Sequence, residues 1–258
     1  MTDEIYISTV LLEKNRWSSK EPSLLVSDWL DKIEIAGFNG MELWENHLLK
    51  ADKAELQRVQ NSPVSVNVLN TYCGFEDEKS EQRKLSAELA HQVNAKAVKF
   101  NFGNNADLEK NYIENLLKWK EILPQDCRLL CECHPYTILE DVEEAARVLN
   151  PLSDYVEIII HAFNGSQENF KKRLDIFSAP TTHVHVAGSG VKGITYSPLE
   201  GEPIVRSLVK TLKENGFNGS WTIEFCNGVA SKNEDIDAIF NAAVNDFKTL
   251  KRELKCYP

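Results

Sequence analysis

The sequence has no long hydrophobic run. Its longest uncharged apolar stretch lies around Ile158 to Ile160, far short of the roughly 20 residues that cross a bilayer. The N-terminus, MTDEIYIS, has no basic stretch ahead of an apolar one, as a secretion signal requires. We therefore expect a cytoplasmic protein that is neither exported nor embedded in a membrane.

Closely spaced cysteines are scarce. The six cysteines are scattered along the chain, which favours reduced thiols over a disulfide framework. Cys131 and Cys133 are the one close pair. On a strand they share a face and Glu132 takes the other, so we interpret them as small core residues in preference to a zinc-binding pair.

Clustered positive charge is also missing. The formal net charge is −10 and no run of Lys and Arg stands out, which argues against a nucleic-acid partner. No G-x-G-x-x-G motif follows the first apolar run, which argues against a dinucleotide-binding open sheet.

The sequence does contain a regular alternation of short apolar runs and longer amphipathic segments. With 258 residues, 42% of them hydrophobic and 26% charged, the chain suits a single domain spanning residues 1–258. The alternation predicts eight βα units, hence a parallel sheet closed into a (β/α)₈ TIM barrel. A doubly wound open sheet shares the alternation and is the competing architecture. The predicted strands are centred near Ile7, Glu42, Asn67, Lys99, Cys131, Ile159, Val184 and Ile223.

Helical spacing is clearest in five of the gaps, at residues 27–37, 76–93, 108–123, 138–149 and 203–216. Ser27 is the predicted N-cap of the first segment. Gly37 and Gly216 are the predicted stops of the first and last segments.

Four of the predicted strands end in a carboxylate or an imidazole. The residues are Glu132, His161, His185 and Glu224, on strands five to eight. A barrel places its active site at the carboxyl ends of its strands, and charges buried there need partners. One divalent cation held by all four would satisfy them, and the mixed N and O donors favour Zn²⁺ or Mn²⁺, then Co²⁺ or Fe²⁺, over Ca²⁺ and Mg²⁺.

Other polar residues near strand ends are candidates for binding a substrate. His183 shares the inward face with His185 but lies deeper, so we expect it to form hydrogen bonds behind the metal site. His134 could position a substrate or cap its loop. Trp44 and Phe75 could face a sugar ring or belong to the core. The other candidates are Glu42, Asn67 and Lys99, which would line the pocket, and Lys192, in a glycine-rich loop where barrels often bind phosphate.

Five segments resemble the xylose-isomerase-like barrel superfamily, in particular its sugar phosphate isomerase/epimerase group. They are GFNGMELWENH, CECHP, HVHV, YSPLEGEPI and GFNGSWTIEF, and the resemblance extends over nearly the whole chain.

The resemblance implies metal ligands at Glu132, His185 and Glu224. Where the family usually has an Asp ligand, followed three residues later by a substrate-binding His, this chain has His161 and Asn164. An imidazole in place of a carboxylate removes one negative charge and favours nitrogen-preferring metals such as Zn²⁺.

The resemblance further implies metal-dependent isomerisation or epimerisation, through an enediolate, of a small polyhydroxylated carbonyl compound such as a sugar or a sugar phosphate. Glu132 and Glu224 would transfer the proton. An inosose-type dehydratase and a non-catalytic sugar-binding barrel are the alternatives, and a homo-oligomer is compatible with all three. An abasic-site nuclease is disfavoured by the acidic charge.

Overall fold

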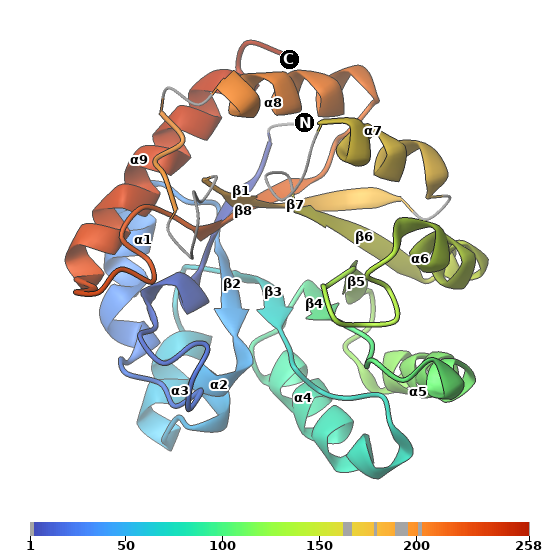
Figure 1. Cartoon of the computed structure of the whole chain (residues 1–258). Helices are drawn as coiled ribbons and strands as arrows, with labels where there is room; N and C mark the ends of the chain where they lie inside the picture. The colour runs from blue at the N-terminus through green and yellow to red at the C-terminus, as the bar shows by residue number, and fades with distance from the viewer. Residues whose placement is uncertain (1–2, 162–166, 178–179, 189–195, 201–202, 258) are drawn as a thin grey trace.

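Eight parallel strands form a closed barrel in the computed structural model (Figure 1), which describes residues 3–161, 167–177, 180–188, 196–200 and 203–257. Each strand pairs with the next along the chain, and β8 pairs with β1. This closure confirms the TIM barrel and excludes the open sheet. The strands are β1 (Ile5–Ser8), β2 (Met41–Trp44), β3 (Val66–Asn70), β4 (Ala97–Phe100), β5 (Arg128–Glu132), β6 (Val156–His161), β7 (Thr181–Ala187) and β8 (Ser220–Phe225).

Helices surround the barrel on the outside (Figure 1). The described α-helices are α1 (Leu30–Ala36), α2 (Glu45–Leu49), α3 (Lys53–Gln60), α4 (Ser80–Gln92), α5 (Glu109–Ile122), α6 (Val142–Leu149), α7 (Gln167–Ile176), α8 (Pro203–Glu214) and α9 (Ile236–Leu254). Helices α1, α4, α5, α6 and α8 lie within the five predicted segments. Over the described ranges, no helix combines the length and hydrophobicity needed to span a membrane.

The start of α1 differs from the sequence prediction, whereas its end agrees. Ser27 is not the N-cap, because a 3-10 turn over Val26–Trp29 precedes the helix and α1 begins at Leu30. The Ser27 hydroxyl and amide instead donate hydrogen bonds to Glu55, at 2.5 and 3.0 Å. Gly37 adopts φ +87°, a left-handed conformation that suits glycine, and ends the helix as predicted.

The alternation of side chains along each strand separates two apolar layers. Inside the barrel, a small cluster fills the middle level and consists of Tyr6, Val68, Ala97, Leu130 and Ile159. The larger cluster lies between the strands and the helices, and it includes Cys131 and Cys133. Their interpretation as core residues is confirmed, and all six cysteines have free thiols. Glu132, between them on β5, therefore points into the barrel.

A buried carboxylate on α9 gives the fold a pH-dependent stability. Asp246 is 2% exposed, accepts a hydrogen bond from the Leu199 amide at 2.9 Å, and has its pKa raised to about 7 by burial. The native state therefore binds this proton more tightly than the unfolded chain does. The stabilisation is complete below the unfolded pKa of about 3.9 and is lost as the pH rises through 7.

We expect Asp246→Asn, which keeps the acceptor oxygen, to raise the melting temperature by about 3–8 °C at pH 8. At pH 4 the change should be small, because Asp246 is then protonated in the native state and in about half of the unfolded chains. Thermal denaturation of both proteins at the two pH values checks this. A larger gain at pH 4 than at pH 8 would contradict it.

Candidate metal centre

A cavity of about 570 Å³ opens at the carboxyl ends of the strands, where barrels carry their active sites. We call its polar part, formed by Lys99, Glu132, His161 and Glu224, the floor. His185 is 1% exposed and lies just beneath it. The predicted ligands thus meet at one place, although they are up to 92 positions apart, from 132 to 224, in the sequence.

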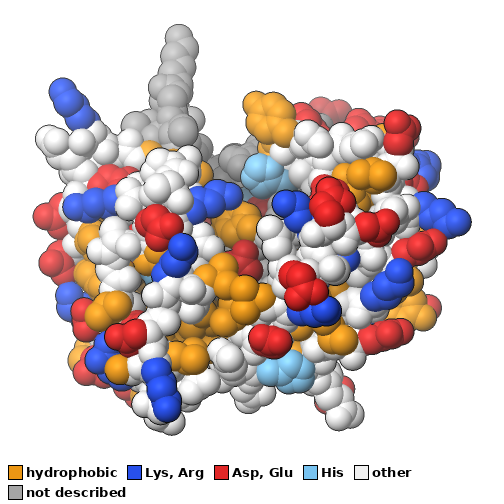
Figure 2. All heavy atoms as spheres, turned by 90° about the horizontal axis from the view of Figure 1, so that it is seen from below, with side chains coloured by type: hydrophobic (Ala, Val, Ile, Leu, Met, Phe, Trp, Pro, Cys, Tyr) orange, Lys and Arg blue, Asp and Glu red, His pale blue; other side chains and the backbone are white. Residues whose placement is uncertain are grey.

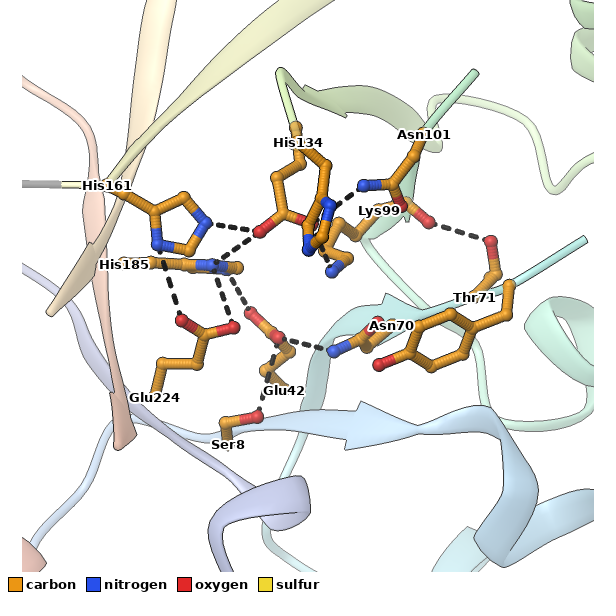
Figure 3. Close-up of polar contacts among 12 residues, drawn as sticks. Ser8, Glu42, Asn70, Thr71, Lys99, Asn101, His134, His161, His185 and Glu224 are labelled. Atoms are coloured by element: carbon orange, nitrogen blue, oxygen red, sulfur yellow. Dashed lines mark hydrogen bonds and ion pairs between the residues drawn. The ribbon is translucent and has the colours of Figure 1, made fainter. Parts of the chain in front are cut away.

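One donor atom from each of the four predicted ligands lies within 4.8 Å of the others. His161 Nε2 contacts Glu132 Oε1, and His161 Nδ1 is 3.4 Å from Glu224 Oε2. His185 Nδ1 is 3.3 Å from Glu224 Oε1 and 3.8 Å from Glu132 Oε1. Figure 3 shows the His161, His185 and Glu224 side chains turned toward one another.

These residues fit a single divalent cation. His185 Nδ1 is buried, faces two carboxylates and has no hydrogen-bond partner within the described part of the chain. Three carboxylates, Glu42, Glu132 and Glu224, are buried with one lysine, Lys99, so a charge of +2 would neutralise the group. Two imidazole nitrogens and two carboxylate oxygens are donors that zinc and manganese accept.

Glu42 lies below the floor and orients His185. Its Oε2 is 2.9 Å from His185 Nε2, while its Oε1 accepts hydrogen bonds from Asn70 Nδ2 at 3.0 Å and Ser8 Oγ at 3.4 Å. A proton on Nε2, held by Glu42, leaves the Nδ1 lone pair for a metal. Glu42 is fully buried and outside the cavity lining, so the structure places it behind a ligand and not against a substrate.

His183 occupies the predicted deeper position. Its Nδ1 is 2.8 Å from Ser220 Oγ and its Nε2 is 2.9 Å from Thr222 Oγ1. Glu42, His183 and His185 are also close enough to hold an ion. Both ring nitrogens of His183 already contact hydroxyl groups. We therefore expect an ion at the other cluster, formed by Glu132, His161, His185 and Glu224.

The two oxygens of Glu132 have different partners. Oε1 faces His161 and His185, whereas Oε2 accepts hydrogen bonds from Lys99 Nζ at 2.5 Å and Asn101 Nδ2 at 2.9 Å. Burial alone would raise the pKa of Glu132, but Lys99 and His161 hold it well below the usual range. The carboxylate is therefore ionised, and its Oε1 faces the candidate ligands His161 and His185.

The charged neighbours of this carboxylate keep their protons. Burial alone would lower the pKa of Lys99, but Glu132 raises it above its usual value. Burial also opposes protonation of His185, yet Glu42 and Glu224 raise its pKa well above the usual range. In the metal-free chain, a proton on His185 thus supplies part of the positive charge that the carboxylates require.

The remaining predicted residues lie in different places. Trp44 and Phe75 are fully buried in the core, outside the cavity lining. Asn67 lies beside Gly40, where the β2–β3 register shifts, and Asn70 occupies the carboxyl end of β3 instead. His134 lines the cavity and is exposed. Asn164 and Lys192 lie outside the described residues.

Five aromatic residues that the sequence reasoning missed line the cavity: Trp17, Tyr72, Phe102, Tyr196 and Phe225. Phe225 directly follows Glu224 and could have been found from that position. The other four lie outside the regular elements, where no periodicity indicates which way a side chain points.

The side of the molecule seen in Figure 2 carries Lys and Arg interspersed with Asp and Glu. No basic stripe crosses this face. Its charge pattern agrees with the acidic balance of the sequence and gives no support to a polyanion-binding surface there.

A family model described as xylose isomerase-like TIM barrel matches residues 30–242. No curated protein sequence matches the chain significantly. Among solved structures, that of a 3-keto-D-glucoside 4-epimerase, YcjR, from E. coli is 15% identical with a TM-score of 0.67, covering 97% of this chain and 100% of that one.

Two further structures are similar over nearly their whole length. The probable 3-DHS dehydratase AsbF from Bacillus anthracis is 13% identical, with a TM-score of 0.70 and coverage of 96% of this chain and 99% of that chain. The IolI protein with a binding zinc atom is 16% identical, with a TM-score of 0.67 and coverage of 99% of both chains. At these identities the likeness shows a shared fold.

Proposed function

Because the chain belongs to the xylose isomerase-like TIM barrel family, we propose that it is a divalent-metal-dependent isomerase or epimerase of a small polyhydroxylated carbonyl compound. The observation that carries this proposal is the convergence of Glu132, His161, His185 and Glu224 within 4.8 Å at the base of the cavity. The zinc atom in the IolI structure supports a metal in a barrel of this shape.

In the proposed chemistry the two glutamates transfer the proton next to a carbonyl group that the metal ion polarises. Bound on the floor, a divalent ion supplies Lewis acidity that makes a C–H bond next to a carbonyl acidic. Glu224 and Glu132 are placed to remove a proton from that carbon and to return one, which passes the substrate through an enediolate. Return to the same carbon gives an epimer, and return to its neighbour gives an isomer.

Lys99 and Asn101 prepare Glu132 for this role. Their hydrogen bonds to Oε2 fix the plane of the carboxylate and direct Oε1 toward the cluster, so Glu132 would accept a proton through Oε1 after a change in its coordination. Lys99 also lines the cavity, so its ammonium group can donate to a substrate oxygen on which negative charge develops.

Solvent exchange tests the proposed reaction directly. We expect protein containing about one Zn²⁺ or Mn²⁺ per chain to incorporate deuterium next to the carbonyl of at least one ketose, hydroxypyruvate or inosose in D₂O, as followed by NMR. Chelated protein should lose this exchange and regain it when the metal is restored. No exchange with any member of the panel by Zn²⁺-, Mn²⁺- or Co²⁺-loaded protein would reject the enediolate reaction for these substrates.

The same experiment separates the alternatives. A dehydratase of cyclic polyols would exchange the proton and also release water, giving an unsaturated product. A non-catalytic barrel would bind a sugar without exchange or product. Either result would replace the isomerase proposal.

A further inference from the structure

Three aromatic side chains form one side of the cavity, which we call the aromatic wall: Trp17, Tyr196 and Phe225. The ring centroids of Trp17 and Phe225 are 5.5 Å apart, and the Tyr196 and Phe225 rings stack at 5.1 Å. The three residues come from the loop after β1, the segment before α8 and the end of β8. Distant parts of the chain thus combine into one continuous apolar surface.

The outermost ring of the wall is exposed but anchored. Trp17 is 50% exposed, although burying a tryptophan would be favourable. The Arg16 guanidinium lies 5.2 Å from the Trp17 ring centroid. Arg16 is itself 4% exposed and is fixed by Glu234 at 2.7 Å and by the carbonyl oxygens of Val10 and Leu11 at 3.0 and 2.9 Å. The ion pair of Arg16 and Glu234 therefore supports a ring that lines the cavity.

The wall starts next to the reacting groups. Glu224 and Phe225, at the end of β8, both line the cavity, so the apolar surface borders the polar floor. A sugar whose carbonyl end lies on the floor has its far end beside the wall. The C–H faces of a ring carry partial positive charge and are attracted to the negative face of an aromatic π-system.

We propose that the aromatic wall binds a second ring, so that the substrate is a sugar whose carbonyl end lies on the floor and whose other end carries a glycosidically attached ring that stacks on Trp17. The reacting sugar occupies the floor, and the attached ring extends along Phe225 and Tyr196 toward the mouth. The cavity volume of about 570 Å³ lies in the middle of the range of pockets for drug-sized ligands and accommodates such a compound. The inference rests on the proposed function only for the identity of the reacting end.

A neighbouring aromatic residue supplies a matched control. Tyr136 is 84% exposed and follows the cavity-lining residues His134 and Pro135, but it is not itself part of the lining. Removing its ring takes away an exposed aromatic group at the same end of the barrel without altering the wall. The effect of the Trp17 ring can therefore be separated from a general loss of exposed apolar surface.

Tryptophan fluorescence provides a direct readout of the wall. Of the five tryptophans, Trp17 is half exposed, whereas Trp29, Trp44, Trp119 and Trp221 are at most 8% exposed. A ring placed on Trp17 should therefore dominate any spectral change. The probes are the phenyl and methyl β-D-glycosides of glucose, galactose and xylose, together with cellobiose, which distinguishes a second sugar ring from an aryl group.

We expect at least one phenyl glycoside or cellobiose to shift the emission and to bind about tenfold more tightly than the corresponding methyl glycoside. Trp17→Ala, measured by calorimetry, should abolish this preference by weakening the ring-bearing glycoside more than the methyl glycoside. Trp17→Phe should keep most of the preference, and Tyr136→Ala should keep all of it.

Three outcomes would overturn the proposal: methyl and ring-bearing glycosides bind equally well, no glycoside in the panel binds, or Trp17→Ala retains the preference. None of these outcomes would contradict proton exchange on free monosaccharides, so the proposed reaction would still stand. Conversely, ring-dependent binding without any exchange would reject the proposed reaction and leave the aromatic wall as a binding site.

Discussion

We expect Glu224→Gln and Glu132→Gln each to lower turnover by about 10²–10⁴-fold while the protein still folds. Glutamine keeps the size of the side chain and one oxygen for a metal but cannot accept the proton, so metal affinity should fall less than activity. Steady-state turnover and the rate of deuterium exchange, measured on the same metal-loaded samples, check this. Wild-type rates in both variants would show that neither carboxylate transfers the proton.

The two substitutions differ in how cleanly they can be interpreted. Glu132 Oε2 is held by Lys99 and Asn101, so a glutamine there can turn its amide toward the lysine and disturb it. Among the described residues Glu224 contacts His161 and His185 and has no lysine in an ion pair with it, so its variant is the cleaner test.

Glu45→Gln is the matched control for both variants. Glu45 is a buried carboxylate that accepts a hydrogen bond from the Tyr72 amide, and burial raises its pKa to about 7. It lies outside the four-residue cluster and the cavity lining. Because Glu45 is already partly protonated at neutral pH, its glutamine variant should keep near-normal turnover.

Glu42→Gln should weaken metal binding by about 10–100-fold without removing a ligand. The neutral amide holds the His185 Nε2 proton less firmly, so the imidazole loses basicity and orientation. Competitive titration against a chromogenic chelator measures the affinity, with Glu45→Gln again as the control. Unchanged affinity in Glu42→Gln would show that His185 does not depend on Glu42.

The barrel could be predicted from the sequence because buried parallel strands require continuous apolar runs. The same logic located Glu132, His161, His185 and Glu224, since a polar side chain at the end of such a run needs a partner. The order of these residues along the chain then brings adjacent strand ends together. The metal identity and the roles of the two glutamates stay predictions.

Depth within the barrel was harder to predict. The alternation of side chains shows that Glu42 points into the barrel but not how deep it lies along the barrel axis. Its contact with His185, 143 positions away, places Glu42 on the far side of this candidate ligand from the cavity. The sequence predicts Asn67 as a pocket residue because it lies at the centre of its apolar run. The shifted register between β2 and β3 leaves it beside Gly40 and places Asn70 nearer the metal ligands. Trp17 and Tyr196 lie outside the regular elements, where position depends on tertiary packing.

The pairing of β1 with β8 has a consequence for synthesis on the ribosome. Glu42 emerges early, the four candidate ligands emerge later, and Glu224 lies on the strand that closes the barrel. Arg16, which supports Trp17, finds its partner Glu234 later still. A nascent chain that ends before β8 lacks one ligand and exposes an open sheet edge. Assembly of the candidate metal site and completion of the cavity are therefore late events, which follow translation of residues through Glu234.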